Sequence, residues 1–144
     1  KVLKIKKIEE IKKIKSLFFI GHIDYEPNID SIITLANLLE LFKKNCKLHI
    51  VGRINNKNKK TLLKYKNIIL YDYLNDYSSV AKLSKYGWAY MNFSTGTQNK
   101  VFDYLDNNLI PIVSQNVHNT LTPENKNYCI VIHNLKHFVR THFE

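Results

Sequence analysis

Short, continuously apolar runs alternate with helical segments, and this alternation restricts the fold of the chain more than any other feature. The segment 17–20 (LFFI) is apolar at every position, 47–52 (KLHIVG) is mostly apolar, and 110–113 (IPIV) is again apolar at every position. Between the first two runs, apolar residues recur every three or four positions over 27–44, which predicts a helix. Strands that are buried on both faces are continuously apolar rather than alternating. The sequence therefore predicts a parallel sheet with helices on both sides.

The rest of the chain extends the same pattern. Further strands are predicted over 68–71, 88–93 and 128–132, and further helices over 58–66, 76–85, 100–107 and 135–143. We interpret residues 120–126 as a polar turn region. Strands that alternate with helices throughout predict an α/β fold with three αβα layers and a mostly parallel sheet of about six strands.

The formal charge of +10 is unevenly distributed. Residues 1–15 contain seven Lys and two Glu, whereas 43–66 contain eight Lys and Arg53 without any acid. Ile, Lys, Asn and Tyr, whose codons are rich in A and T, are all abundant, so composition alone explains much of the Lys. Arg, the preferred residue for forked phosphate and base contacts, is nearly absent. These observations argue against a nucleic-acid partner and leave peripheral contact with an anionic membrane as a use for the charge.

The organisation of the chain follows from its length and apolar runs. Its 144 residues correspond to one domain, which we place at 16–144 after a Lys-rich lead-in or linker at 1–15. No apolar run approaches the roughly 20 residues that a membrane span needs. Cys46 and Cys129 lack metal-ligand spacing and suit a reducing cytoplasm, although a disulfide between them stays open. Because the chain begins with Lys1 and shows no signal peptide, we interpret it as a piece of a longer protein.

A ligand site is expected where the strands end, because parallel α/β sheets bind ligands at the carboxyl ends of their strands. The candidate loops cover 21–28, 52–58, 72–76 and 94–99. The last of these (STGTQN) leads directly into the helix near Lys100, so its glycine, hydroxyls and free N–H groups could hold a phosphate. The same residues also suit an ordinary turn with a helix cap. The absence of GxxxxGK[ST] and GxGxxG patterns argues against a nucleoside triphosphatase and an ordinary dinucleotide site.

Six motifs, in order, resemble the C-terminal half of group 1 glycosyltransferases. They are FIG at 19–21, YxPN at 25–28, LHIVG at 48–52, NIIL at 67–70, NKVFDYL at 99–105 and IPIV at 110–113. The similarity covers about 16–115. Such enzymes have the GT-B architecture, in which two Rossmann-like domains face each other across a cleft. The resemblance implies that this chain is the donor-binding half of an enzyme that moves a sugar from a nucleotide-diphosphate sugar to an acceptor.

The resemblance also implies roles for individual residues. The donor diphosphate falls on Gly21, His22, Thr95, Gly96, Thr97 and Lys100. Asp103 matches the acidic residue that holds the ribose, and the nucleobase falls against Tyr73 and Leu74. The nucleotide sugar is a substrate, and neither a cofactor nor a protein-held metal is implied. The other partners implied are an N-terminal Rossmann-like domain and an unidentified glycan, lipid or protein acceptor.

The chain also departs from the family pattern. Thr95 and Asp103 stand where the family often has two glutamates. The segment 22–26 is acidic where the family has Arg and Lys, and Asn107 and Asn108 replace a Gly that usually precedes Pro111. Structural roles therefore stay open for the proposed site residues, such as a helix-dipole role for Asp103. The alternative function is a non-catalytic Rossmann-like binding or interaction module with a degenerate donor site.

Overall fold

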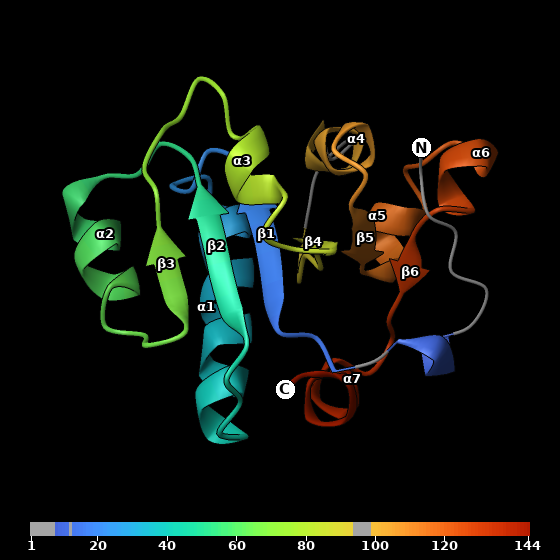
Figure 1. Ribbon diagram of the computed structural model, residues 1–144, viewed down its shortest axis with the longest axis horizontal. Coiled ribbons are helices and arrows are strands. Elements are labelled where there is room, and N and C mark those ends of the chain that lie inside the picture. The colour runs from blue at the N-terminus through green and yellow to red at the C-terminus, as the bar shows by residue number, and fades with distance from the viewer. Residues whose placement is uncertain (1–7, 12, 94–98) are drawn as a thin grey trace.

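The computed structural model describes residues 8–11, 13–93 and 99–144 and contains one six-stranded sheet (Figure 1). All strand pairs are parallel, and the order across the sheet is β3-β2-β1-β4-β5-β6. The strands are β1 (Ser16–Ile20), β2 (Lys47–Val51), β3 (Ile68–Leu70), β4 (Tyr86–Ala89), β5 (Ile110–Val113) and β6 (Ile130–Val131). The predicted parallel sheet is confirmed.

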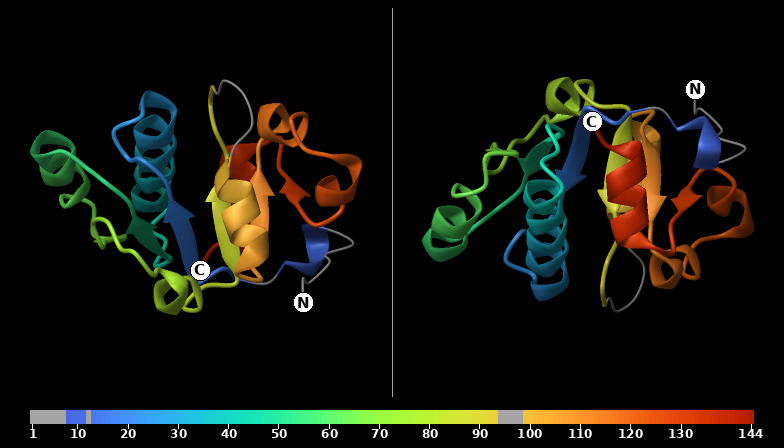
Figure 2. Two further views of the ribbon diagram at one scale, coloured as in Figure 1. Left: turned by 90° about the horizontal axis from the view of Figure 1, so that it is seen from above. Right: turned by 90° about the horizontal axis from the view of Figure 1, so that it is seen from below.

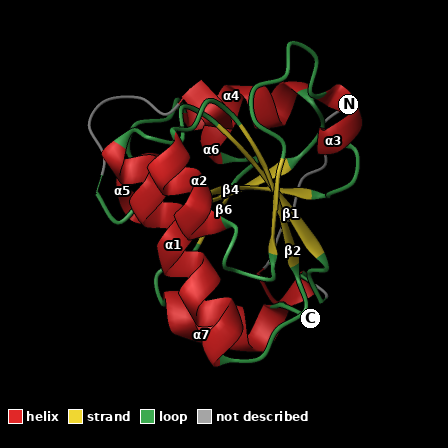
Figure 3. Ribbon diagram, turned by 90° about the vertical axis from the view of Figure 1, so that its left-hand side faces the viewer, coloured by secondary structure: helices red, strands yellow, loops and turns green. Residues whose placement is uncertain are grey.

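Helices cover both faces of the sheet, which confirms the predicted three layers (Figures 2 and 3). One face carries α1 (Glu26–Leu41), α2 (Asn56–Leu62) and α7 (Leu135–His142). The other carries α3 (Ser78–Ala81), α4 (Asn99–Asp106) and α5 (Gln115–His118), and α6 (Pro123–Lys126) follows α5. A short 3-10 helix, Ile8–Glu10, precedes the sheet. None of the described helices is long and apolar enough to cross a membrane.

The continuous apolar run of β1 is explained by its two buried faces. Leu17 and Phe19 pack into the core beneath α1 and α7, whereas Phe18 packs into the core beneath α3 and α4. The Phe18 ring meets the Tyr104 ring edge-on, with 6.0 Å between the ring centroids. A polar residue at any of these three positions would face a core, so the strand has no solvent side.

Strand β4 begins at Tyr86, two residues before the start predicted from the sequence. It includes Gly87, which packs against the ring of Tyr104 from α4. A Cβ atom at position 87 would lie 2.4 Å from that ring. The glycine therefore gives the large aromatic side chain room on the sheet.

Part of the predicted lead-in packs against the domain. Ile11 and Ile14 are buried in the core. The backbone N–H of Ile14 donates to the His142 carbonyl, and its carbonyl accepts from the Glu144 N–H. The domain division at residue 16 stays a prediction, but these two isoleucines belong to the packed body.

The strand order places a crevice beside β1. From β1 the chain moves outward through β2 to β3, and it then returns to the other side of β1 to form β4. Loops that leave the adjacent β1 and β4 therefore diverge to opposite faces. Such a switch point, at the carboxyl ends of the strands, is where open α/β sheets bind ligands.

Candidate functional site

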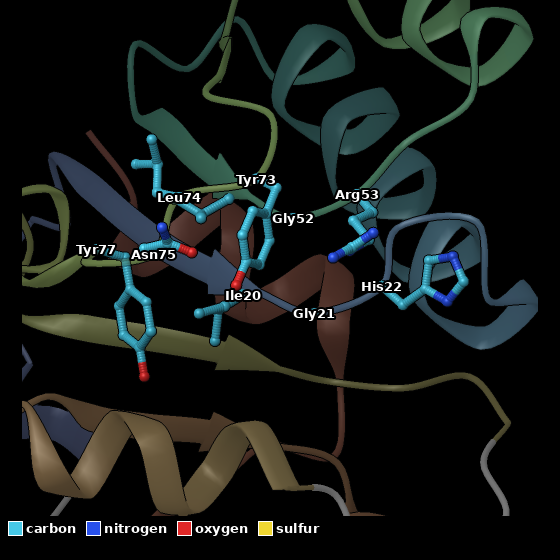
Figure 4. Close-up of a pocket in the computed structure, with 10 residues that line it drawn as sticks. Ile20, Gly21, His22, Gly52, Arg53, Tyr73, Leu74, Asn75 and Tyr77 are labelled. Carbon is cyan, nitrogen blue, oxygen red and sulfur yellow. The ribbon is translucent and has the colours of Figure 1, made fainter.

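A pocket of about 270 Å³ lies at the carboxyl ends of β1 and β2 (Figure 4). Residues 20–22 from the end of β1, residues 51–53 from the end of β2, and residues 73–75 with Tyr77 from the loop after β3 line it. Pockets that enclose drug-sized ligands span roughly 300–1,000 Å³. The cavity is therefore suited to one part of a nucleotide sugar rather than to the whole molecule.

Two glycines hold the strand ends of the pocket in direct backbone contact. A Cβ atom on Gly52 would lie 1.8 Å from the Gly21 carbonyl oxygen, so no larger residue fits there without movement. The Gly21 N–H donates to the Val51 carbonyl at 3.2 Å, and the Gly52 N–H donates to the Asp72 carbonyl at 2.8 Å. The loops after β1, β2 and β3 are thereby fixed side by side.

The pocket has a charged end and an aromatic end. In Figure 4 His22 and Arg53 lie toward one end, and Tyr77 and Asn75 lie toward the other. Tyr73 lies between them, and the Arg53 Cζ atom is 4.8 Å from the centroid of its ring, a cation–π distance. This arrangement suits a ligand with an anionic group at one end and a flat ring at the other.

Lys100 brings a buried amine to the switch point from the first turn of α4. Its side chain is 7% exposed, and its Cε atom lies 3.6 Å from the place a Cβ on Gly21 would take. Its Nζ atom is 5.4 Å from the centroid of the Phe19 ring. Burial lowers the pKa of Lys100 from 10.5 to about 8, although the nearby Asp103 carboxylate acts in the opposite direction. An anion at Gly21 would favour the protonated amine.

Asn28 approaches Gly21 from the first turn of α1. Its Nδ2 atom lies 3.0 Å from the place of the Gly21 Cβ and donates to the His22 carbonyl at 2.8 Å. Its Oδ1 atom is buried and has no hydrogen-bond partner among the described residues. Gly21 thus lies between polar side chains from α1 and α4, and a Cβ at this position would crowd Asn28 and contact Lys100.

Asp103 lies one turn further along α4 and contacts the pocket indirectly. Burial raises the pKa of the Tyr77 hydroxyl, and the charge of Asp103 and a hydrogen bond to its carboxylate raise it further. Tyr77 lines the pocket, whereas Asp103 lies behind it. In Figure 4 the Tyr77 hydroxyl points toward α4.

The acidic segment after β1 has a structural contact that the sequence did not reveal. The Asp24 carboxylate accepts hydrogen bonds from the Asn55 backbone N–H at 2.9 Å and from the Asn58 Nδ2 at 2.8 Å. The hydrogen bond from Asn58 lowers the pKa of Asp24 most, and the hydrogen bond from Asn55 lowers it further. The carboxylate therefore ties the loop after β1 to the start of α2 and is occupied there.

The structure brings together most of the site residues predicted from the sequence. Gly21, His22, Tyr73 and Leu74 line the pocket, Lys100 packs beside Gly21, and Asp103 lies behind Tyr77. Thr95, Gly96 and Thr97 lie outside the described residues. The functional roles of all nine stay predictions.

Sequence reasoning did not single out four further residues near the site, which are Asn28, Arg53, Asn75 and Tyr77. Arg53 had a usable signal, because it directly follows a buried strand that ends in glycine and is one of two arginines. The other three depend on the strand order and on side-chain packing, which no local pattern reveals.

Comparisons with known proteins give likenesses in structure only. No protein-family model matches the chain, and no curated protein matches it by sequence. A variant of S. aureus TarM, solved in complex with Fondaparinux, alpha-GlcNAc-glycerol and UDP, is 16% identical, with a TM-score of 0.64. That match covers 97% of this chain and 30% of that chain.

Two more solved structures are similar. WaaG, a glycosyltransferase involved in lipopolysaccharide biosynthesis, is 19% identical with a TM-score of 0.61, covering 92% of this chain and 38% of that chain. The pneumococcal O-GlcNAc transferase GtfA, in complex with UDP and GlcNAc, is 12% identical with a TM-score of 0.56. That match covers 96% of this chain and 29% of that chain. The chain thus spans between 29% and 38% of these three proteins. As the resemblance in sequence implied, its fold is that of a Rossmann-like domain of GT-B glycosyltransferases.

Proposed function

We propose that this chain binds the nucleotide-diphosphate sugar donor of a glycosyltransferase. The observation that carries the proposal is the convergence of Lys100 and Asn28 on Gly21, at the switch point of the sheet and beside the pocket. Two proteins of similar fold were solved with UDP, which supports a nucleotide as the ligand. The adjoining pocket would take the nucleoside.

In this proposal, different parts of the donor bind at the two ends of the pocket. The base and ribose occupy the aromatic end near Tyr73, Leu74 and Tyr77, and Asp103 reaches the ribose hydroxyls past Tyr77. The diphosphate lies over Gly21, where the backbone can approach it closely, with Lys100 and Arg53 as cations. Oriented donors and cations stabilise the negative charge that develops on a leaving diphosphate.

The transfer reaction belongs to a larger protein in this proposal. We expect the acceptor site, and any general base, to lie mainly on a second Rossmann-like domain that closes the other side of the cleft. The chain by itself should then bind a nucleotide weakly and transfer no sugar. Robust transfer or donor hydrolysis by these 144 residues would contradict this division of labour.

Isothermal titration calorimetry with UDP, GDP and ADP tests donor binding. Lys100→Met keeps most of the length of the side chain and removes its charge, so it should weaken binding by about tenfold or more, as expected for a lost charge-assisted hydrogen bond. The matched control is Lys57→Met, which removes an exposed lysine from α2. Tyr73→Ala should weaken binding about fivefold or more through lost base stacking.

The same titrations separate the proposal from its alternative. If no nucleotide saturates the chain below about 1 mM, and Lys100→Met changes nothing, the donor site is not functional. The fold would then serve a non-catalytic binding or interaction module.

A further inference from the structure

The edge of the sheet opposite the pocket carries a row of exposed lysines. Lys15, Lys47, Lys66 and Lys85 stand at or shortly before the starts of β1, β2, β3 and β4, and all four are exposed. In the parallel register Ser16 pairs with Lys47, Leu17 with Tyr86, and Leu48 with Ile68. The four lysines therefore lie at nearly the same level on neighbouring strands, which are about 4.8 Å apart.

Three leucines are exposed at the same edge. Leu41, Leu63 and Leu83 are 66%, 57% and 57% exposed, the highest values among the large apolar side chains described. Each stands at or just after the carboxyl end of a helix, where the chain returns to begin the next strand. The Leu83 carbonyl accepts a hydrogen bond from the Ser16 Oγ at 2.8 Å, which places Leu83 at the start of β1. Leucines and lysines thus share one surface, which we call the basic edge.

The basic edge has an excess of positive charge. Residues 43–66 contain no acid. The acids near this edge include Glu10 in the segment that leads into β1, Glu40 and Asp106 at the carboxyl ends of α1 and α4, and Glu144, which lies 4.0 Å from Lys15. Lys13, Lys43, Lys64 and Lys82 are also exposed in the segments that lead into these strands. The surface therefore complements an anionic partner.

We infer that the basic edge docks the protein on an anionic lipid bilayer. Lysines held near a surface of acidic headgroups attract it electrostatically, and leucines between them can insert at the interface. Neither the electrostatic attraction nor the apolar insertion gives firm binding alone, and here both come from one edge of the sheet. The pocket lies at the opposite edge, so docking leaves it open.

The kinds of exposed side chain favour a bilayer over a nucleic acid. Single-stranded nucleic acids bind to exposed aromatic rings on which bases stack. The exposed aromatics of the described residues are Tyr25, Tyr73 and Phe93, which follow the carboxyl ends of strands at the pocket edge, and Phe102, which lies in the first half of α4. Arg53 also lies at the pocket edge, whereas Arg140 lies over the half-buried Phe42 ring, next to Leu41. The aromatic rings at the basic edge, Phe42 and Tyr65, are half-buried, so leucines are its most exposed apolar side chains, which suits acyl chains.

Vesicle co-sedimentation tests the inference with the full chain. The protein should sediment with vesicles of phosphatidylcholine mixed with phosphatidylglycerol, and not with phosphatidylcholine alone, and salt should weaken the binding. Lys47→Glu with Lys66→Glu should weaken it about 25-fold or more, from about fivefold for each lysine lost. The matched control is Lys57→Glu with Lys136→Glu, an equal change of charge on exposed residues outside the basic edge.

Leu63→Ser supplies a second, uncharged test. It should weaken vesicle binding severalfold at every salt concentration while leaving the net charge and the buried core unchanged. Absence of vesicle binding, or equal loss in the two lysine pairs, would overturn the inference. Salt-sensitive binding to single-stranded RNA, lost in the Lys47 and Lys66 variant and without vesicle binding, would reassign the edge to nucleic acid.

Discussion

Lys100 should give the protein a stability that rises with pH above the neutral range. Burial at the switch point lowers its pKa from 10.5 to about 8. In the unfolded chain the amine keeps its ordinary pKa, so between these two values the unfolded state binds more protons than the folded state. Folding is therefore penalised below about pH 8, where the buried amine is charged, and the penalty disappears as the pH rises toward 10.5.

The size of this effect follows from the lowered pKa. At about 1.4 kcal/mol for each pH unit, the fall from 10.5 to about 8 corresponds to about 3 kcal/mol. Because the side chain is only 7% exposed, solvent screens little of it. We expect Lys100→Met to be about 3 kcal/mol more stable than the wild type near pH 7, with the difference vanishing near pH 10.5.

Urea unfolding of both proteins between about pH 7 and about pH 10 measures this difference directly. Tyrosines and other lysines also titrate in this range, but both proteins contain them, so their contributions cancel in the difference between the two stabilities. Lys57→Met should follow the wild type in parallel, because its amine is exposed. Parallel curves for the wild type and Lys100→Met would refute the argument that the amine is buried at a cost.

Nucleotide binding adds a second measurement on the same group. A diphosphate beside Gly21 favours the charged amine, so binding near pH 8.5 should take up a proton. The binding enthalpy of the wild type should then depend on the ionisation enthalpy of the buffer, and that of Lys100→Met should not. Loss of the pH-dependent stability difference contradicts the burial of Lys100, whereas absence of proton uptake alone contradicts only its role toward the donor.

Three further predictions concern the scaffold of the site. Gly52→Ala should cost about 3 kcal/mol in the free energy of unfolding, because its Cβ would collide with the Gly21 carbonyl at 1.8 Å; an unchanged urea midpoint would contradict this contact. Tyr104→Phe should cost about 1 kcal/mol, because the buried hydroxyl donates to the Trp88 carbonyl at 2.7 Å, and equal stability would show that this bond contributes nothing. The lowered pKa of Asp24 contributes stability above pH 3.8 that is lost as the pH falls further. As the pH is lowered below 3.8, Asp24→Asn should therefore lose less stability than the wild type. Identical stability profiles of the two proteins would contradict this role of Asp24.

The layers of the fold could be predicted from the sequence because they follow from local patterns. The run at 17–20 is apolar at every position, and β1 is buried on both faces. The periodic apolar positions over 27–44 form α1, although the helix ends at Leu41. Such patterns show which residues of a segment are buried, and they can be seen in the sequence of that segment alone.

Features that depend on two distant segments could not be predicted in this way. The predicted helix over 76–85 is reduced to α3, because the chain must return to begin β4 at Tyr86, and the Leu83 carbonyl accepts a hydrogen bond from the Ser16 Oγ at the start of β1. Similarly, Tyr77 joins the pocket only because α3 packs over β1, where its ring stacks on Phe18 with 5.8 Å between the centroids. Neither contact leaves a periodic signal in the sequence.

The absence of Arg and Lys after β1 suggests, from the sequence, a weakened phosphate site. In the structure a cation approaches the same place from another element. Asp24 is occupied by Asn55 and Asn58, so its charge is held toward α2. Lys100 reaches the same Gly21 from α4, and its burial makes its charge more effective than that of an exposed lysine. His22 is largely exposed, and its Nε2 lies 4.0 Å from Asp24. If the chain binds a donor, we therefore expect His22→Ala to weaken nucleotide binding less than Lys100→Met does, and calorimetry showing the reverse order would return the cationic role to the loop after β1.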